Sequence, residues 1–201
     1  MKPVTETGGI VLKKVLRGES GVLFYILSPD EGIVTCMKRV AVKKSSALPD
    51  LFDTVTFRVG ELRTGDLKFI QDFELHESRI GLAKNYGAFV AATELSEFVS
   101  ANGRDLETHK KLYEIFGASL GALMAGANPE VVKIKFFYVL LKDEGYPVKE
   151  SFAFGLNGDE MECLKQILST PSLDCKADAE ASRLLLEKFT RWILSETEFR
   201  I

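Results

Sequence analysis

The chain lacks the residue clusters on which most catalytic and metal sites depend. Among its 201 residues are only two histidines, His76 and His109, which stand far apart in the sequence. Its three cysteines, Cys36, Cys163 and Cys175, form no C-x-x-C pair, which favours free thiols in a reducing compartment over disulfides. The glycine-rich phosphate loop and H-E-x-x-H are both missing. We therefore expect no catalytic residue, no metal and no cofactor, with zinc held by Cys163, Cys175 and a histidine as the weaker alternative.

A targeting leader and a long apolar run are missing too. The first residues show no charged segment followed by an apolar stretch and a small-residue cleavage site. The longest apolar run, residues 116–127, is shorter than the roughly 20 residues that a membrane-spanning helix needs. These absences predict a cytoplasmic protein that has no membrane partner.

The first third of the chain is rich in strand signals. Runs of β-branched and aromatic residues alternate with polar ones and are separated by turn residues such as Gly18-Glu19-Ser20 and the segment 28–32. No long helical pattern interrupts them, which favours a closed barrel. The sequence predicts an α+β protein whose residues 1–77 form a five-stranded OB-type β-barrel. The expected strands are residues 6–15, 21–28, 33–42, 54–63 and 67–75.

The apolar period changes to that of helices after Glu77, so residues 78–201 are predicted to form a helical domain. The third helix is apolar nearly all round and should lie at the centre of the bundle, with Asn128 and Pro129 at its start. Residues 149–159 are expected to be irregular and held to the bundle by Phe152 and Phe154. The expected helices are residues 82–102, 106–125, 131–144, 161–168 and 178–195.

Positive charge is concentrated near the N-terminus. The formal net charge of −3 disfavours indiscriminate binding of nucleic acid. Residues 1–44, however, hold eight basic and four acidic side chains, so they carry about +4 and the remainder about −7. The local field, not the net charge, governs where a phosphate backbone docks. Alternatively, these cations only keep strand edges soluble. The candidate DNA-binding residues are Lys13, Lys14, Arg17, Lys38, Arg39, Lys43 and Lys44.

Two neighbouring aromatic residues, Phe24 and Tyr25, could stack on bases beside these cations. Both belong to one predicted strand, in which successive side chains point to opposite faces. At least one of them must therefore face the core.

Several short motifs, in order and spacing, resemble the RecO family of bacterial recombination mediators over almost the whole chain. Two match the start of the family pattern: Gly9-Ile10-Val11-Leu12 and Gly18-Glu19-Ser20. The remaining matches are Lys38 with Lys43-Lys44-Ser45, Pro129-Glu130, Lys135-Phe136, Leu140-Leu141, Gly145-Tyr146 and Phe189-Thr190-Arg191. The chain departs from the family pattern at Arg39 and Phe137. It resembles a short member that lacks the zinc-finger cysteines expected after Tyr146, whose place the reduced segment 149–159 takes.

The resemblance implies a mediator of DNA repair and homologous recombination. Such proteins bind single- and double-stranded DNA, anneal complementary strands and, with RecR, assist the loading of RecA onto DNA coated by the single-stranded-DNA-binding protein SSB. They also bind the acidic C-terminal tail of SSB, which needs an apolar groove with a cation at its rim. We expect that groove on the third helix, at Lys133, Lys135, Phe136 and Leu140. The alternatives are that these lysines merely extend to solvent, and that the protein is an adaptor for the SSB tail or RecR without strong DNA binding.

Overall fold

The computed structural model describes residues 4–39, 48–61, 67–104, 106 and 108–201. The chain divides into two compact units, one of Met1–Gly81 with Gly103–Glu114 and one of Leu82–Asn102 with Ile115–Ile201. All five described strands belong to the first unit. The predicted division after residue 77 into two continuous domains stays a prediction.

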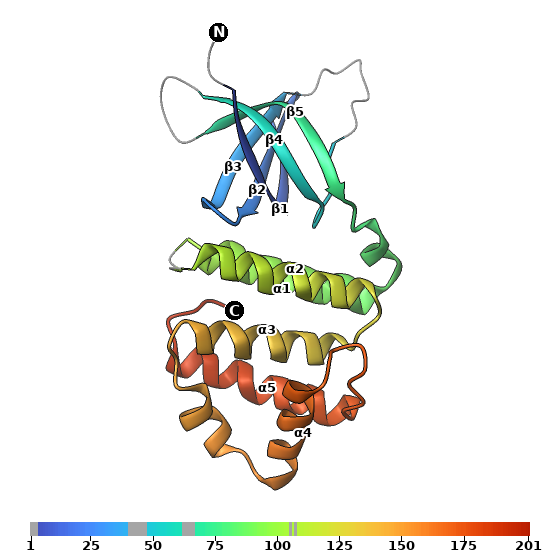
Figure 1. Ribbon diagram of the computed structural model, residues 1–201, viewed down its shortest axis with the longest axis vertical. Coiled ribbons are helices and arrows are strands. Elements are labelled where there is room, and N and C mark those ends of the chain that lie inside the picture. The colour runs from blue at the N-terminus through green and yellow to red at the C-terminus, as the bar shows by residue number, and fades with distance from the viewer. Residues whose placement is uncertain (1–3, 40–47, 62–66, 105, 107) are drawn as a thin grey trace. The chain divides into compact units, whose positions relative to one another are not determined.

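The first unit contains a closed barrel with the strand order β1-β2-β3-β5-β4 (Figure 1). Four of the five strand contacts are antiparallel, and β3 and β5 pair in parallel. The predicted fold class, an OB-type barrel followed by helices, is confirmed. Predicted strand residues 40–42 and 62–63 lie outside the described part. The strands are β1 (Val4–Arg17), β2 (Gly21–Ser28), β3 (Gly32–Arg39), β4 (Thr54–Glu61) and β5 (Lys68–Glu77).

Strand β1 closes the barrel because it is long enough to pair with two neighbours. Its first half pairs with β4 and its second half with β2, and the change occurs at Ile10. A β-bulge between Val11 and Lys13 bends the strand at this point. A side chain at Gly9 would place its Cβ 2.4 Å from the carbonyl oxygen of Leu27, so only glycine fits where the two backbones approach.

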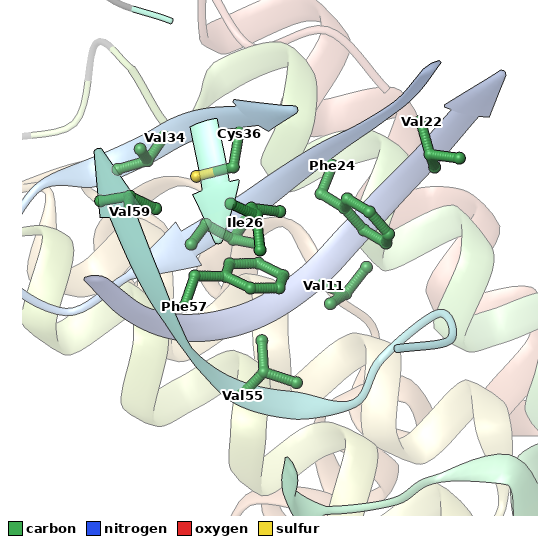
Figure 2. Packing of buried hydrophobic residues seen from close by; sticks show 10 residues of the cluster. Val11, Val22, Phe24, Ile26, Val34, Cys36, Val55, Phe57 and Val59 are labelled. Carbon is green, nitrogen blue, oxygen red and sulfur yellow. The ribbon is translucent and has the colours of Figure 1, made fainter. Parts of the chain in front are cut away.

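Alternating side chains of four strands and Ile70 of β5 fill the barrel interior. The rings of Phe24 and Phe57 lie 5.6 Å apart between centroids, and Phe73 packs against Phe57 from the side. Figure 2 shows this cluster from close by. The cluster consists of Val11, Val22, Phe24, Ile26, Val34, Cys36, Val55, Phe57, Val59 and Ile70.

The helices confirm the predicted helical region, with corrected boundaries. The first helix begins at Tyr86 rather than at Leu82, because the Asn85 side chain accepts a hydrogen bond from the backbone N–H of Ala88 (3.1 Å) and caps it there. Leu82 lies in a preceding 3₁₀ turn, η1 (Ile80–Lys84). The helices are α1 (Tyr86–Asn102), α2 (His109–Met124), α3 (Pro129–Asp143), α4 (Gly158–Ser169) and α5 (Ala179–Glu196).

Helix α3 is the central helix of its unit, as predicted, and packs against α1, α4 and α5 (Figure 1). The Asn128 side chain caps it by accepting from the backbone N–H groups of Glu130 and Val131, at 2.8 and 3.1 Å. Phe98 of α1 makes edge-to-face contacts with the two α3 rings of Phe136 and Phe137. Aromatic pairs of this geometry add to the stability that burial provides.

The segment 149–159, predicted to be irregular, is partly helical. It contains a π-helical turn, η2 (Val148–Phe152), and a 3₁₀ turn, η3 (Ala153–Gly155). Phe152 holds this segment to the bundle by stacking on Phe189 of α5, with 4.3 Å between ring centroids. The prediction for Phe154 was wrong, because its side chain is 86% exposed. At about three residues per turn, side chains two positions apart point about 120° away from each other, so Phe154 does not lie on the face at which Phe152 is buried.

Candidate nucleic-acid interface

The register of β1, β2 and β3 brings predicted DNA-binding residues to one end of the barrel. Arg17 pairs with Gly21, and Gly21 pairs with Arg39, so the two arginines lie on the same rung of the sheet. Two strand spacings separate their backbones, which is about 10 Å. A Cβ at position 21 would lie 2.6 Å from the carbonyl oxygen of Arg17, so only glycine fits between them. No side chain on β2 therefore separates the two guanidinium groups.

The predicted cations divide between two faces of this three-stranded sheet. Residues on one rung point to the same side, and successive rungs alternate. Lys13 shares its rung with Tyr25, and Arg17 shares its rung with Arg39, so these side chains lie on the outer face. Lys14 and Lys38 share rungs with the core residues Phe24 and Val22, and so lie on the inward-facing side. Lys43 and Lys44 lie outside the described residues.

The outer-face cations are the less neutralised group. Lys13 and Arg17 are exposed and make no ion pair with any residue that the structure describes. Arg39 lies over the ring of Phe69, with 5.9 Å from its guanidinium carbon to the ring centroid, and this contact leaves its charge available. On the inward side, Lys14 lies 3.8 Å from Asp50, whereas Lys38 donates to the neutral carbonyl oxygen of Gln71 at 2.6 Å, so of these two lysines only Lys14 has an acid at ion-pair distance among the described residues.

One of the two aromatic candidates cannot contact bases. Phe24 is fully buried in the barrel core (Figure 2), so its proposed stacking role is excluded. Tyr25 is only partly buried and lies on the outer face opposite Lys13. Its stacking on a base stays a prediction.

The predicted groove for an acidic tail does not exist as one surface. Lys133 lines a cavity of about 730 Å³, and Lys135 and Phe136 line a different one of about 240 Å³. Leu140 is fully buried and lines neither. The physical reason is helical geometry: two residues in sequence correspond to about 200° around a helix, so Lys133 and Lys135 point to nearly opposite sides of α3.

The larger cavity combines an aromatic floor with a rim of mixed charge. Phe98 and Phe137 form part of its lining. Lys133 forms an ion pair with Glu94 at 2.8 Å, which neutralises much of its charge. The sequence analysis did not predict this rim, because its charged residues other than Lys133 come from segments that are distant in the sequence. The remaining charged residues of the lining are Glu97, Glu187, Arg191 and Arg200.

The smaller cavity offers a single basic group. The Lys135 ammonium donates to the carbonyl oxygen of Thr170. Burial lowers the pKa of Lys135, because a charged ammonium is less well solvated there than in water. This lysine is thus already engaged in holding the α4–α5 connection.

The described residues contain no group of three or more histidine, cysteine or acidic side chains that could hold a metal. Burial raises the pKa of the Cys36 thiol to about 12, and burial likewise raises the pKa of Cys163. A metal-binding cysteine needs the opposite shift, since the thiolate is the ligand. In the same described part of the chain, no helix has both the length and the apolar content needed to span a membrane.

The fold and this surface define a protein with an OB-type barrel, a basic barrel end and a helical region. No model of a known protein family matches the chain. The chain is, however, distantly similar to two curated proteins, each described as DNA repair protein RecO. The protein from Nostoc punctiforme is 30% identical over 131 residues, which cover 64% of this chain and 43% of that protein. The protein from Synechocystis sp. is 30% identical over 131 residues, which cover 65% of this chain and 48% of that protein. The match thus spans less than half of either relative.

Proposed function

We propose that the chain belongs to the RecO family and acts in DNA repair and homologous recombination. In this role it binds single- and double-stranded DNA through the barrel, anneals complementary strands, and assists RecA loading on SSB-coated DNA together with RecR. Catalysis has no part in this function, because binding and charge neutralisation are sufficient for annealing. The single observation that carries the proposal is the rung on which Arg17 and Arg39 lie side by side without an acidic partner among the described residues.

The distribution of charge on the barrel supports this surface as the phosphate-binding one. Arg58 of β4 is a contrasting case, because it lies 3.5 Å from Glu6 and 3.8 Å from Asp72. Acids neutralise the cation on β4, whereas the cations of the outer face on β1 and β3 are left without such partners in the described part of the chain. A surface with uncompensated positive charge attracts a polyanion and releases its counterions.

The salt dependence of DNA binding tests the proposal. The outer-face contacts of Lys13, Arg17 and Arg39 contribute about −2 to the slope of the logarithm of the binding constant against the logarithm of salt, at about −0.7 per contact for single strands, and each further phosphate contact makes the slope steeper. Arg17→Gln and Arg39→Gln should each reduce the slope by about 0.7 and weaken binding. Filter binding with a labelled oligonucleotide over a series of salt concentrations measures both quantities.

Arg58→Gln is the matched control, since it removes the same charge from the same barrel at a site that acids already neutralise. It should leave the slope unchanged. Absence of binding by the wild-type protein at low salt would contradict the proposal, and so would equal slopes for Arg17→Gln and the wild type. Strand annealing, and RecA loading with RecR on SSB-coated DNA, are then measured with the same variants.

A second candidate function is that of an adaptor that binds the SSB tail or RecR without strong DNA binding. The cavity of about 730 Å³ favours it, because its apolar floor and the cations Lys133, Arg191 and Arg200 suit an acidic peptide with an aromatic end. Glu94, Glu97 and Glu187 on the same rim limit this complementarity.

Two variants distinguish the cavities. Arg191→Gln should weaken binding of an SSB-tail peptide several-fold, whereas Lys135→Gln, at the smaller cavity, should not. Titration calorimetry with the peptide measures both affinities. If only Lys135→Gln weakens binding, the smaller cavity binds the peptide. If neither variant changes the affinity, neither cavity is the binding site.

A further inference from the structure

The end of the β1–β2 hairpin exposes an aliphatic side chain among cations. Leu16 is 80% exposed, although it lies within a described strand and pairs with a buried core residue, Val22. The hairpin that presents it is closely defined. Gly18 has a φ of 64°, in the left-handed region that favours glycine, and Gly21 leaves no room for a side chain.

Leu16 lies on the inward-facing side of the sheet, between two lysines. Lys14 precedes it by two residues on the same face, at about 7 Å along the strand. Lys38 lies on the same rung across β2, about 10 Å away. This face is distinct from the outer face of Lys13, Arg17 and Arg39.

Both lysines keep most of their charge. Lys38 donates to the carbonyl oxygen of Gln71, a neutral acceptor, and an ammonium has three donors. The Lys14–Asp50 pair is 3.8 Å long and the Asp50 side chain is 63% exposed, so solvent screens the pair. The leucine is therefore flanked by positive charge.

The exposed leucine Leu184 has different surroundings. Leu184 on α5 is 51% exposed, and on its helix it neighbours Glu180 and Glu187, both of which pair with Arg183. An exposed leucine beside acids carries no attraction for a polyanion. The position of Leu16 differs in this respect.

We propose that Leu16 is a wedge that inserts between neighbouring bases of a nucleic acid strand whose phosphates Lys14 and Lys38 contact. Leucine is one of the apolar side chains that unstack base steps in this way. The occupant is a nucleic acid strand rather than an apolar protein surface, because the cations on both sides of the leucine complement phosphates. This inference rests on the proposed function and assigns a role to the second face of the hairpin, on which Leu16 separates bases while Lys14 and Lys38 contact the adjoining phosphates.

The test uses a single-stranded oligonucleotide that contains 2-aminopurine, an adenine analogue whose fluorescence rises when it is unstacked. Saturating wild-type protein should raise the fluorescence. Leu16→Ser should remove most of this rise and weaken binding about fivefold to tenfold, since burial of the leucine is lost. The salt slope should not change, because no charge is altered. Leu16→Met should keep the rise, and Leu184→Ser should behave as the wild type.

The outcomes separate the wedge from DNA binding itself. If the wild-type protein fails to bind the oligonucleotide in filter binding, the proposed function fails and the wedge fails with it. If it binds and Leu16→Ser shows the full fluorescence rise, the wedge is overturned while DNA binding stands. Weaker binding with an unchanged rise also overturns the wedge. Circular dichroism verifies that each variant is folded.

Discussion

Arg79 stabilises the barrel through hydrogen bonds at the point where β4 begins and β5 ends. Its side chain is buried, and one terminal nitrogen, Nη1, donates to the carbonyl oxygen of Phe52 and to Oγ1 of Thr54, each at 2.7 Å. The other, Nη2, pairs with Glu77, and the backbone N–H of Arg79 donates to the Asp53 carboxylate at 3.0 Å. We expect Arg79→Ala to destabilise the barrel strongly.

Arg79 holds residues 52 and 53, which precede β4 and form backbone hydrogen bonds with β1. Phe52 has a φ of 69°, which is unfavourable for a residue with a side chain. Its N–H donates to the carbonyl oxygen of Val11 at 2.8 Å, and the carbonyl oxygen of Asp53 accepts from the N–H of Val11 at 3.0 Å. Loss of Arg79 leaves the strained residue without one of the contacts that keep it in place.

The loss of stability in Arg79→Ala can be estimated from these hydrogen bonds. Each bond from the charged guanidinium to Phe52 or Thr54 contributes about 1.5–3 kcal/mol. The ion pair with Glu77, whose own side chain is 45% exposed, adds about 1 kcal/mol. Against this, Nε of Arg79 is buried without a hydrogen-bond partner, which costs about 1–3 kcal/mol. Arg79→Ala should therefore lower the free energy of unfolding by about 3 kcal/mol, and Arg79→Lys, which keeps one donor in reach, by about half of that.

The assay exploits the single tryptophan. Trp192 lies on α5 in the second compact unit, so its fluorescence follows that unit, whereas far-ultraviolet circular dichroism follows both. In urea, Arg79→Ala should shift the dichroism transition, and a tryptophan transition that stays in place would show that the units unfold separately. Arg58→Ala, at an exposed paired arginine, should shift neither by more than about 0.5 kcal/mol. A dichroism transition unchanged in Arg79→Ala would refute the reasoning.

Two further expectations concern titrating groups. Because burial raises the pKa of Cys36 to about 12 and its side chain is fully buried, a thiol reagent at neutral pH should modify Cys163 and Cys175 but not Cys36. Peptide mass spectrometry checks this, and labelling of Cys36 at the rate of Cys163 would count against it. The pKa of Glu160 is lowered by hydrogen bonds from Lys188 and from the backbone N–H of Asn157. Its contribution to stability should therefore be present above its unfolded pKa of about 4.3 and be lost as the pH falls through its lower folded pKa. Urea titrations at several pH values should show a weaker acid destabilisation in Glu160→Gln than in the wild type, and identical profiles would contradict it.

The strands and helices could be predicted from local sequence patterns, but the pairing of the strands in the barrel could not. Residues 54–63 and 67–75 were predicted as strands from local patterns, and β4 and β5 lie there; likewise, Asn128 with Pro129 marked the start of α3. The double pairing of β1 leaves no local signal, because it depends on the register of strands that are distant in sequence. The parallel contact of β3 with β5 is of the same kind.

The candidate site was predictable to a different degree at each residue. The split of Lys133 and Lys135 could have been read from helical periodicity alone. The opposite faces of Lys13 and Lys14 follow from the strand period of two, but the rung that joins Arg17 to Arg39 needs the register. Leu16 had no signal at all, since an exposed and a buried leucine look alike in an alternating strand.

The mild acidity of the chain does not oppose DNA binding at this barrel end. At physiological ionic strength the field of an exposed charge falls off over about 8 Å. In the closed barrel, β4 separates β1 from β5 on one side, and β2 and β3 separate them on the other; even the shorter way is two strand spacings, about 10 Å, which exceeds this length. The acids of β5, such as Asp72 and Glu74, are therefore screened from Arg17, and they act locally on Arg58 and His76. A phosphate at the hairpin would experience mainly the nearby cations, so the net charge of −3 does not by itself decide against the proposed binding there.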